Sequence, residues 1–299
     1  MNVARRLSAR SGTAAAPFVR LILAPSAAKL DRMPNQATEA RTIAIETLRR
    51  DPLRNIVLLK HLEAFPDHTR VHHIAREAGS ASLVLVETAA SPYDRTTYSA
   101  TAFAALVSSD HPCLTEALIE HVPRDVGIVF KLASEGDHDV VAAHFPLERT
   151  TSVLSFTATT GFAREPSVRL TAHPAQAVFD AFEAQGHARA WLEPLLQSGR
   201  AFACVLEEGG TPLSMCFAFE NYRPVWEVGG VYTAPSSRGR GLAARVVKTA
   251  IAELAERGLT PRYQAHDDNA ASIALAESIG LTRFLTITHF LSAARPHPT

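Results

Sequence analysis

The sequence predicts a mixed α/β fold, in which helices flank a mostly antiparallel central sheet and the chain forms two domains. Runs typical of strands and of helices follow one another along both parts of the chain. Gly209-Gly210 separates two strand-like runs and indicates a hairpin. Residues 225–266 read as strand, glycine loop, helix and strand, which predicts a crossover connection. With 299 residues, 46% of them hydrophobic, the chain is long enough to form two domains, each with an ordinary hydrophobic core.

The composition excludes several classes of protein. Thirty basic and thirty acidic residues cancel, so no general basic field attracts nucleic acid or acidic membranes. No apolar run approaches the ~18–20 residues needed to cross a bilayer. The cysteines, Cys113, Cys204 and Cys216, are odd in number and far apart in sequence. They indicate neither a disulfide framework nor a zinc site, and they favour the reducing cytoplasm.

Residues 1–35 stand apart from the folded chain in this interpretation. They are rich in arginine and small residues and contain no acidic residue before Asp31. An organelle transit peptide has such a composition. We favour a disordered extension, or a start assigned too early, with Met33 beginning the folded protein. The prolines and small polar residues of 160–167 then predict a boundary between an N-terminal α/β domain, 36–160, and a C-terminal domain, 165–295.

The N-terminal domain is expected to begin with helices and to continue with strands and helices in alternation. Apolar spacing predicts helices over 37–50, 52–65, 111–122 and 135–145, and strands over 69–77, 81–88, 96–107, 126–133 and 150–159. No glycine-rich loop interrupts this part of the chain.

The C-terminal domain has a clearer element order. We expect strands over 168–172, 201–208, 213–220, 225–233, 262–266 and 281–291, and helices over 174–198, 242–258 and 269–280. Gly258 should cap the second of these helices.

The stretch VYTAPSSRGRGLAARVV, residues 231–247, suggests a phosphate site. A helix N-terminus has unpaired N–H groups and a partial positive charge, so it attracts phosphate. Gly239 and Gly241 let a ligand approach the backbone closely, and Arg238 and Arg240 can add charge-assisted hydrogen bonds. A turn that serves only to start a helix would use the same residues.

Two familiar phosphate motifs fit this stretch poorly. The chain contains no Gly-x-x-x-x-Gly-Lys-Ser/Thr run, which a P-loop requires. Gly239, Gly241 and Ala244 satisfy the dinucleotide pattern G-x-G-x-x-G/A, but residues 234–238 separate the first glycine from the strand. A dinucleotide-dependent oxidoreductase is therefore a minor alternative.

The third candidate ligand is the pyrophosphate of coenzyme A. The stretch resembles the acyl-CoA-binding motif of the GNAT superfamily of N-acetyltransferases, Arg/Gln-x-x-Gly-x-Gly/Ala, through Arg238, Gly241 and Ala243. Downstream, NAASIALAESIGL resembles the second mark of this family, an asparagine that opens a helix ending in a Gly-hydrophobic pair. The resemblance implies a GNAT fold over the C-terminal domain, with acetyl-CoA as cosubstrate and a primary amine of a small molecule or peptide as acceptor. Residues 38–160 are a candidate degenerate copy of the same fold.

The resemblance also implies roles for individual residues. The pantetheine arm would follow the backbone of Val231, Tyr232 and Thr233. Asn269 would meet the cofactor with its side chain, a role compatible with that of a helix N-cap. The pyrophosphate would rest on the backbone amides of the loop and helix start: Arg238, Gly239, Arg240, Gly241, Leu242, Ala243 and Ala244.

Acyl transfer needs a deprotonated amine, a stabilised oxyanion and a proton for the leaving thiolate. Glu227 matches the strand glutamate that acts as general base in the histone-acetylating branch of the family; a glutamate at the rim of the site, held in a salt bridge, is the alternative. Gly229-Gly230 could form a bulge that exposes an N–H to the thioester carbonyl, or could simply allow close packing.

The chain departs from the family pattern where a general acid is expected. Ala276 stands where many members have a tyrosine, and Gln264 where another branch has a glutamate. Water, Tyr232, Tyr263 or Ser272 could substitute. A CoA-binding sensor or scaffold without catalysis is therefore the main alternative function. We expect no metal, because the adjacent residues of the 266–269 turn rarely point at one ion.

Overall fold

The computed structural model describes residues 34–294. The expectations for the N-terminal extension and for Met33 as a start lie outside the described residues.

Within the described residues, the strands form a single 11-stranded sheet, in the order β1-β2-β3-β4-β11-β5-β10-β9-β8-β7-β6. The strands are β1 Thr69–Arg76, β2 Gly79–Glu87, β3 Phe103–Ser109, β4 Ile128–Leu132, β5 Glu148–Thr157, β6 Arg169–Thr171, β7 Ala201–Glu208, β8 Thr211–Tyr222, β9 Val225–Thr233, β10 Thr260–His266 and β11 Thr282–Ser292. Only the pairs β3/β4 and β9/β10 are parallel. The predicted fold class, a mostly antiparallel sheet flanked by helices, is confirmed.

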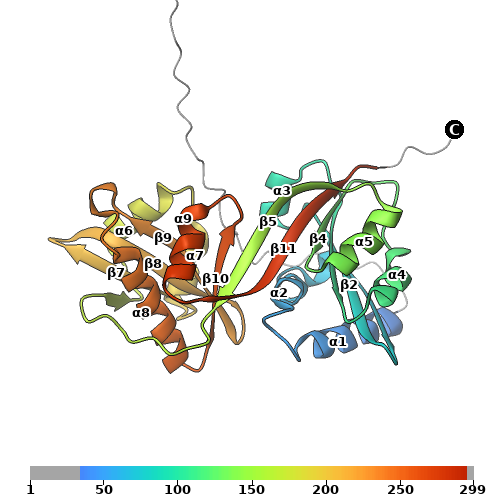
Figure 1. The fold of residues 1–299 in the computed structure, drawn as a ribbon, viewed down its shortest axis with the longest axis horizontal. Coiled ribbons are helices and arrows are strands. Elements are labelled where there is room, and N and C mark those ends of the chain that lie inside the picture. The colour runs from blue at the N-terminus through green and yellow to red at the C-terminus, as the bar shows by residue number, and fades with distance from the viewer. Residues whose placement is uncertain (1–33, 295–299) are drawn as a thin grey trace, which may run out of the picture.

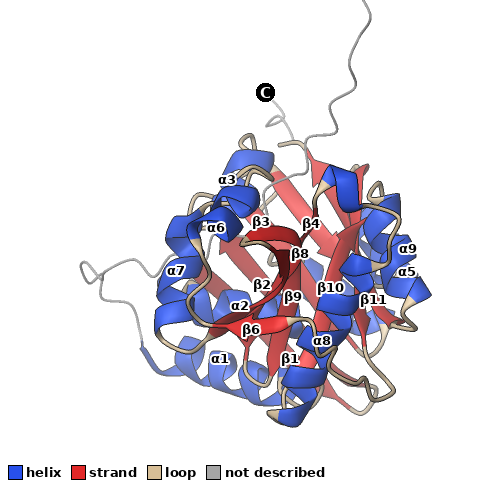
Figure 2. Cartoon of the chain, turned by 90° about the vertical axis from the view of Figure 1, so that its left-hand side faces the viewer, coloured by secondary structure: helices blue, strands red, loops and turns tan. Residues whose placement is uncertain are grey.

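Helices cover both faces of this sheet. They are α1 Pro34–Leu48, α2 Ile56–Ala64, α3 Pro92–Thr97, α4 Pro112–Ile119, α5 Glu135–His144, α6 Gln176–Glu183, α7 Arg189–Gln197, α8 Leu242–Glu256 and α9 Ala270–Ser278, with 3-10 turns η1 Pro66–His68 and η2 Pro235–Ser237. Figure 2 shows α5, α8 and α9 on one side of the strands and α1, α6 and α7 on the other. No helix in the described part of the chain is long and apolar enough to cross a membrane.

The two halves of the chain repeat one element order. Apart from β6, which opens the C-terminal half, and α3, which lies between β2 and β3, each half has two helices, three antiparallel strands, a helix that crosses over to a parallel strand, and then a helix and a final strand. The final strands, β5 and β11, are exchanged: β11 pairs with β4 of the N-terminal half, and β5 pairs with β10 of the C-terminal half. They also pair with each other, as Figure 1 shows at the junction. The exchange gives β4 and β10 the neighbours that their open edges require.

Helix α2 lies between the halves, on the side of the N-terminal half that faces the C-terminal half (Figure 1). Its sequence IVLLKHLEA is apolar almost all round, which is typical of a buried helix. One hydrophobic cluster joins Leu59 of α2 to Val86 of the N-terminal half and to Tyr222 and Val225 of the C-terminal half. The face of the sheet that packs on this helix is called the α2 face below.

Two expected elements differ in the structure. The strand expected over 96–107 begins only at Phe103, and residues 96 and 97 belong to α3, because the Ser91 hydroxyl caps this helix by accepting from the Asp94 N–H and Pro92 opens it. The single helix expected over 174–198 is divided into α6 and α7 around Gly186, whose φ of 86° ends a helix.

Because α2 lies between the two halves, its apolar contacts are expected to contribute strongly to the stability of the protein. Leu59→Ala is expected to lower the free energy of unfolding by about 2–5 kcal/mol, because the 1% exposed side chain leaves a cavity between the halves. Urea unfolding followed by tryptophan fluorescence measures the loss. The control Ile43→Ala, at a side chain 44% exposed on α1, should change stability by less than about 0.5 kcal/mol. Equal losses for both variants would contradict this role of α2.

Candidate active site

Strands β9 and β10 run side by side for only part of their length. Their parallel pairing extends from Val225/Thr260 to Val228/Tyr263, after which β10 pairs with β5 on its other side. The rest of β9, Gly229–Thr233, is partly exposed and pairs with β8 alone. The backbone groups of Val231, Tyr232 and Thr233 on the side toward β10 can therefore pair with a polar chain from a ligand.

A β-bulge lies where the two strands separate. Met215 pairs with Tyr232 and Phe217 with Gly229, so the single residue Cys216 faces both Gly230 and Val231. Gly230 has a φ of 60°, and a Cβ placed on it would lie 2.8 Å from Cε2 of Phe182. The strand therefore bulges, and another side chain packs against it; the exposure of an N–H to a thioester carbonyl stays a prediction.

The glycine loop leads into an uncapped helix. Gly239 and Gly241 have φ values of 74° and 71°, with open space where a Cβ would lie. Gly241 is the N-cap of α8 and provides no side chain to its first N–H groups, those of Leu242, Ala243 and Ala244. The exposed Arg238 donates from Nε to the Thr233 carbonyl at 3.3 Å, and Arg240 is exposed as well. Free amides, a helix dipole and two arginines thus meet at one end of α8.

Asn269 is the N-cap of α9. Its Oδ1 accepts a hydrogen bond from the Ser272 N–H at 3.1 Å, and the residue is exposed. The capping role expected for it is confirmed. Its contact with a cofactor stays a prediction.

Glu227 is buried and held by polar side chains, and it does not lie at the rim of the site. Its Oε2 accepts from Asn221 Nδ2 at 2.6 Å and lies 3.3 Å from Nη1 of the fully buried Arg262. Arg262 Nη2 also donates to the Ser155 hydroxyl at 3.1 Å. Oε1 lies 3.9 Å from the point where Gly229, the residue next to Gly230, would carry a Cβ. One carboxylate oxygen is thus held by polar partners, and the other lies beside the backbone of Gly229.

The sequence argument missed Arg262. Its signal is a single arginine inside the strand TPRYQAH, and only the register opposite Glu227 reveals the pair. Burial lowers the pKa of Arg262 to about 10, and the Glu227 carboxylate partly offsets this effect. Arg262 therefore remains charged at neutral pH and fixes the position of the Glu227 carboxylate.

The positions where the family has a general acid carry no acid here. Ala276 is fully buried in the core beside α8, and the Gln264 amide donates to the Ser155 hydroxyl at 3.4 Å. Tyr263 is buried in the same core, and that burial raises its pKa. Tyr232 is partly exposed on β9. None of these placements identifies a proton donor.

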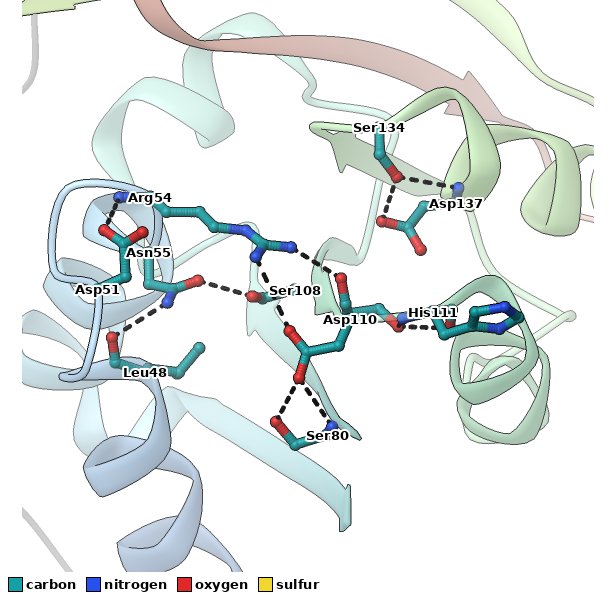
Figure 3. Close-up of polar contacts among 11 residues, drawn as sticks. Leu48, Asp51, Arg54, Asn55, Ser80, Ser108, Asp110, His111, Ser134 and Asp137 are labelled. Carbon is teal, nitrogen blue, oxygen red and sulfur yellow. Dashed lines mark hydrogen bonds and ion pairs between the residues drawn. The ribbon is translucent and has the colours of Figure 1, made fainter. Parts of the chain in front are cut away.

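The N-terminal half has its own strand-loop-helix turn, between β3 and α4, and Figure 3 shows the polar contacts around Asp110 and His111 in this turn. Its loop is only Asp110 and His111, without glycine, and α4 opens with Pro112, which has no N–H. The Asp110 carboxylate accepts from the Ser80 N–H at 2.8 Å and lies 3.8 Å from the Arg54 guanidinium, beside a cavity of about 140 Å³. A carboxylate at this turn repels phosphate, so the two halves are not equivalent as anion sites.

The described residues contain no group of three or more His, Cys, Asp or Glu side chains that could hold a metal ion. In the 266–269 turn, Asp267 instead pairs with Arg149 and accepts from the Thr151 hydroxyl at 3.2 Å.

A mostly antiparallel sheet with one crossover through a glycine loop is the fold class expected of an acyl-CoA N-acyltransferase. Residues 171–281 match the Acetyltransferase (GNAT) family. Residues 171–281 are therefore a GNAT-family domain, which confirms the resemblance to this family and supports acyl transfer in general.

Three solved structures share the fold. An acetyltransferase of the GNAT family from Colwellia psychrerythraea has a TM-score of 0.58 at 15% identity, over 86% of this chain and 97% of that one. A GCN5-related N-acetyltransferase from Sphaerobacter thermophilus has a TM-score of 0.56 at 14% identity, over 89% and 95%. The GCN5-related N-acetyltransferase from Kribbella flavida has a TM-score of 0.50 at 14% identity, over 89% and 98%. No curated protein has a significantly similar sequence.

The bulge makes Gly230 a demanding position. Gly230→Ala is expected to cost about 2–4 kcal/mol of stability, because a Cβ at this φ is strained and also meets the Phe182 ring. Gly239→Ala is the matched control, since its φ is similar but its Cβ would lie in open space. Gly239→Ala should lower the free energy of unfolding only by the backbone strain of an alanine at positive φ, about 1–2 kcal/mol. Thermal and urea unfolding measure both; a Gly230→Ala variant no less stable than Gly239→Ala would contradict close packing at the bulge.

Proposed function

We propose that the protein transfers an acetyl group from acetyl-CoA to a primary amine of a small molecule or peptide. The observation that carries this proposal is the separation of β9 from β10 at a bulge, followed by a glycine loop and the uncapped start of α8. Such a site offers backbone groups for an extended polar chain and amides for a phosphate group at its end. Coenzyme A has both features, since its pantetheine arm is an extended polar chain with a pyrophosphate at its end.

The cosubstrate would lie along two segments. Val231, Tyr232 and Thr233 would pair with the pantetheine arm, and the amides of the run Arg238, Gly239, Arg240, Gly241, Leu242, Ala243 and Ala244 would hold the pyrophosphate. The arginine side chains add positive charge at the same end. Asn269 would reach the cofactor through its amide while its Oδ1 caps α9.

In the proposed reaction, Glu227 takes a proton from the acceptor ammonium through Oε1, directly or through water. The amine nitrogen attacks the thioester carbonyl, and a backbone N–H at the bulge stabilises the oxyanion. This attack forms the new N–C bond and gives a tetrahedral intermediate. When the intermediate collapses, the C–S bond breaks and the thiolate leaves; the second proton of the attacking nitrogen passes through water to the thiolate, and the amide remains. A thiol with a pKa of ~8–9 is a tolerable leaving group, so transfer does not require a side-chain acid.

We also propose that the protein is located in the cytoplasm. The three cysteines are free thiols, and the buried pair Cys204 and Cys216 face each other across β7 and β8 without a disulfide. Free thiols in this arrangement support a reducing compartment, the cytoplasm.

A CoA-binding sensor or scaffold is the second candidate function. It is favoured by Ala276, which the core encloses, and by Gln264, whose amide hydrogen-bonds with Ser155. The antiparallel hairpins β7-β8-β9 lack repeated βαβ units, which disfavours the dinucleotide alternative.

A negative charge at the loop should prevent cosubstrate binding. Gly241→Asp is expected to weaken acetyl-CoA binding about tenfold or more relative to Gly241→Asn, because the carboxylate repels pyrophosphate. Asparagine has almost the same shape and tolerates a positive φ, so this pair of variants differs mainly in charge. Isothermal titration and the acetyl-CoA-dependent rise in unfolding temperature provide the measurement. Equal affinities in the two variants, or no wild-type binding at millimolar acetyl-CoA, would contradict the proposed site.

Glu227→Gln is expected to lower kcat about 10²–10⁴-fold, because the amide cannot take the proton from the acceptor. Release of CoA, followed with a thiol reagent across a panel of amines, gives the rates. Glu220→Gln is the control, since it removes a largely buried carboxylate of β8 that pairs with Arg200. Acetyl-CoA should still raise the unfolding temperature of both variants. Turnover in the wild type rules out the sensor, and turnover undiminished in Glu227→Gln rules out this base.

A further inference from the structure

Two buried ion pairs lie on the α2 face. Lys131 Nζ of β4 lies 2.7 Å from Asp94 Oδ1 and 2.9 Å from Asp94 Oδ2 of α3. On β9 and β10, Arg262 Nη1 lies 3.3 Å from Glu227 Oε2. In each pair a cation and a carboxylate neutralise one another, so neither pair carries a net charge.

A third cation, Lys60 of α2, belongs to neither pair. Every other residue of α2 from Ile56 to Leu62 is buried, whereas Lys60 is partly exposed. Within residues 34–294 its ammonium group has no hydrogen bond or ion pair, although it lies within electrostatic range of both buried pairs. The positive charge of Lys60 is therefore not neutralised by the part of the chain that the structure describes.

The surroundings of Lys60 make its charged, protonated form less favourable. Burial and the neighbouring cations Arg262 and Lys131 lower the pKa of Lys60 to about 8, against the opposite effect of Glu227 and Asp94. The side chain is thus still mostly protonated at neutral pH.

The nearby histidines neither add to this charge nor neutralise it. Burial lowers the pKa of His61 and of His289 to about 3, so both are neutral at physiological pH. His289 is held there by a 2.6 Å hydrogen bond between its Nδ1 and the Tyr98 hydroxyl. The uncompensated charge in this part of the α2 face is therefore a single ammonium group.

Lys60 and Glu227 lie on the same side of the sheet. Leu59 of α2 shares a hydrophobic cluster with Val225, which is two residues before Glu227 on β9 and so on the same face of that strand, and the charge of Glu227 acts on Lys60. An acceptor whose amine is beside Glu227 therefore has the rest of its molecule on the α2 face, which Lys60 shares. A partly desolvated ammonium group without a counter-ion is costly, and an anion from a ligand reduces that cost.

We propose that the acceptor amine carries an anionic group, a carboxylate or a phosphate, and that Lys60 is its counter-ion. This inference rests on the proposed function, because it assigns the acceptor to the α2 face beside Glu227. It narrows the acceptor class from amines in general to amino acids, acidic peptides and phosphorylated amines.

The experiment uses the full chain, acetyl-CoA and matched acceptors that differ in one charge. Each amino acid is compared with its amide, and phosphoethanolamine with ethanolamine, by the rate of CoA release. In parallel, the unfolding temperature of the CoA-loaded protein is measured with each compound. The anionic member of an accepted pair should have a kcat/KM about 10- to 100-fold higher, as expected for hydrogen bonds to a charged group. The carboxylate and phosphate pairs distinguish the two possible anions.

Lys60→Met should abolish this preference, so that the acid and its neutral partner give equal kcat/KM values. Lys60→Arg should retain part of it, because the charge remains. Lys248→Met is the matched control, since it removes a partly exposed lysine from α8, on the other face of the sheet. The rise in unfolding temperature with acetyl-CoA should be unchanged in all three variants, which shows that they fold.

Each outcome supports or overturns the inference. If acetyl-CoA binds but no anionic compound is preferred, in turnover or in unfolding temperature, the inference is wrong and the proposed site stands. If Lys60→Met keeps the preference of the wild type, the counter-ion is another residue and the inference is also wrong. If acetyl-CoA itself does not stabilise the protein, the proposed function fails first, and the inference fails with it.

Discussion

The exchange of β5 and β11 between the halves is the constraint on which the rest of this structure depends. β10 receives a neighbour for its second edge from the N-terminal half, and β4 receives one from the C-terminal half. Because β5 and β11 also pair with each other, eleven strands form one continuous sheet in the described residues. α2 then packs on a surface that neither half provides alone, as its contacts with β2 and β8 show.

The candidate site is a consequence of how this sheet meets its hydrogen-bonding requirements. β10 is satisfied by β5 at Tyr263–His266, so it can separate from β9 without leaving its backbone unpaired on both sides. Gly230 bends β9 at the same level. The buried pair of Glu227 and Arg262 lies just before this point, where the two strands are still together, and it fixes one carboxylate oxygen while the other lies beside Gly229.

Local signals in the sequence were sufficient for much of the C-terminal half. Gly209-Gly210 forms the expected hairpin turn with φ values of 57° and 79°, and Gly258 ends α8 with a φ of 69°. Asn269 caps its helix as expected. These features depend on the conformational preferences of one or two residues, so a short stretch of sequence predicts them.

The features that a linear reading did not reveal depend on register or on distant packing. Arg262 is 35 positions from Glu227, and only the parallel register places the two side chains together. Lys60 is separated from both by the domain boundary expected at 160–167, and its lone positive charge matters only because α2 lies against the C-terminal strands. The strand exchange likewise leaves no mark in local periodicity, since β5 and β11 read as ordinary strands whichever edge they cover.

The repeated element order, together with the exchange, makes this chain comparable to a strand-swapped dimer whose two protomers are covalently joined. In a dimer of separate chains, such an exchange would depend on protein concentration. Here the linker between β5 and β6 fixes the effective concentration of one half around the other, so the exchange is an intramolecular step. The joined halves are also free to differ: one keeps a glycine loop at its helix start, and the other has Asp110 and Pro112.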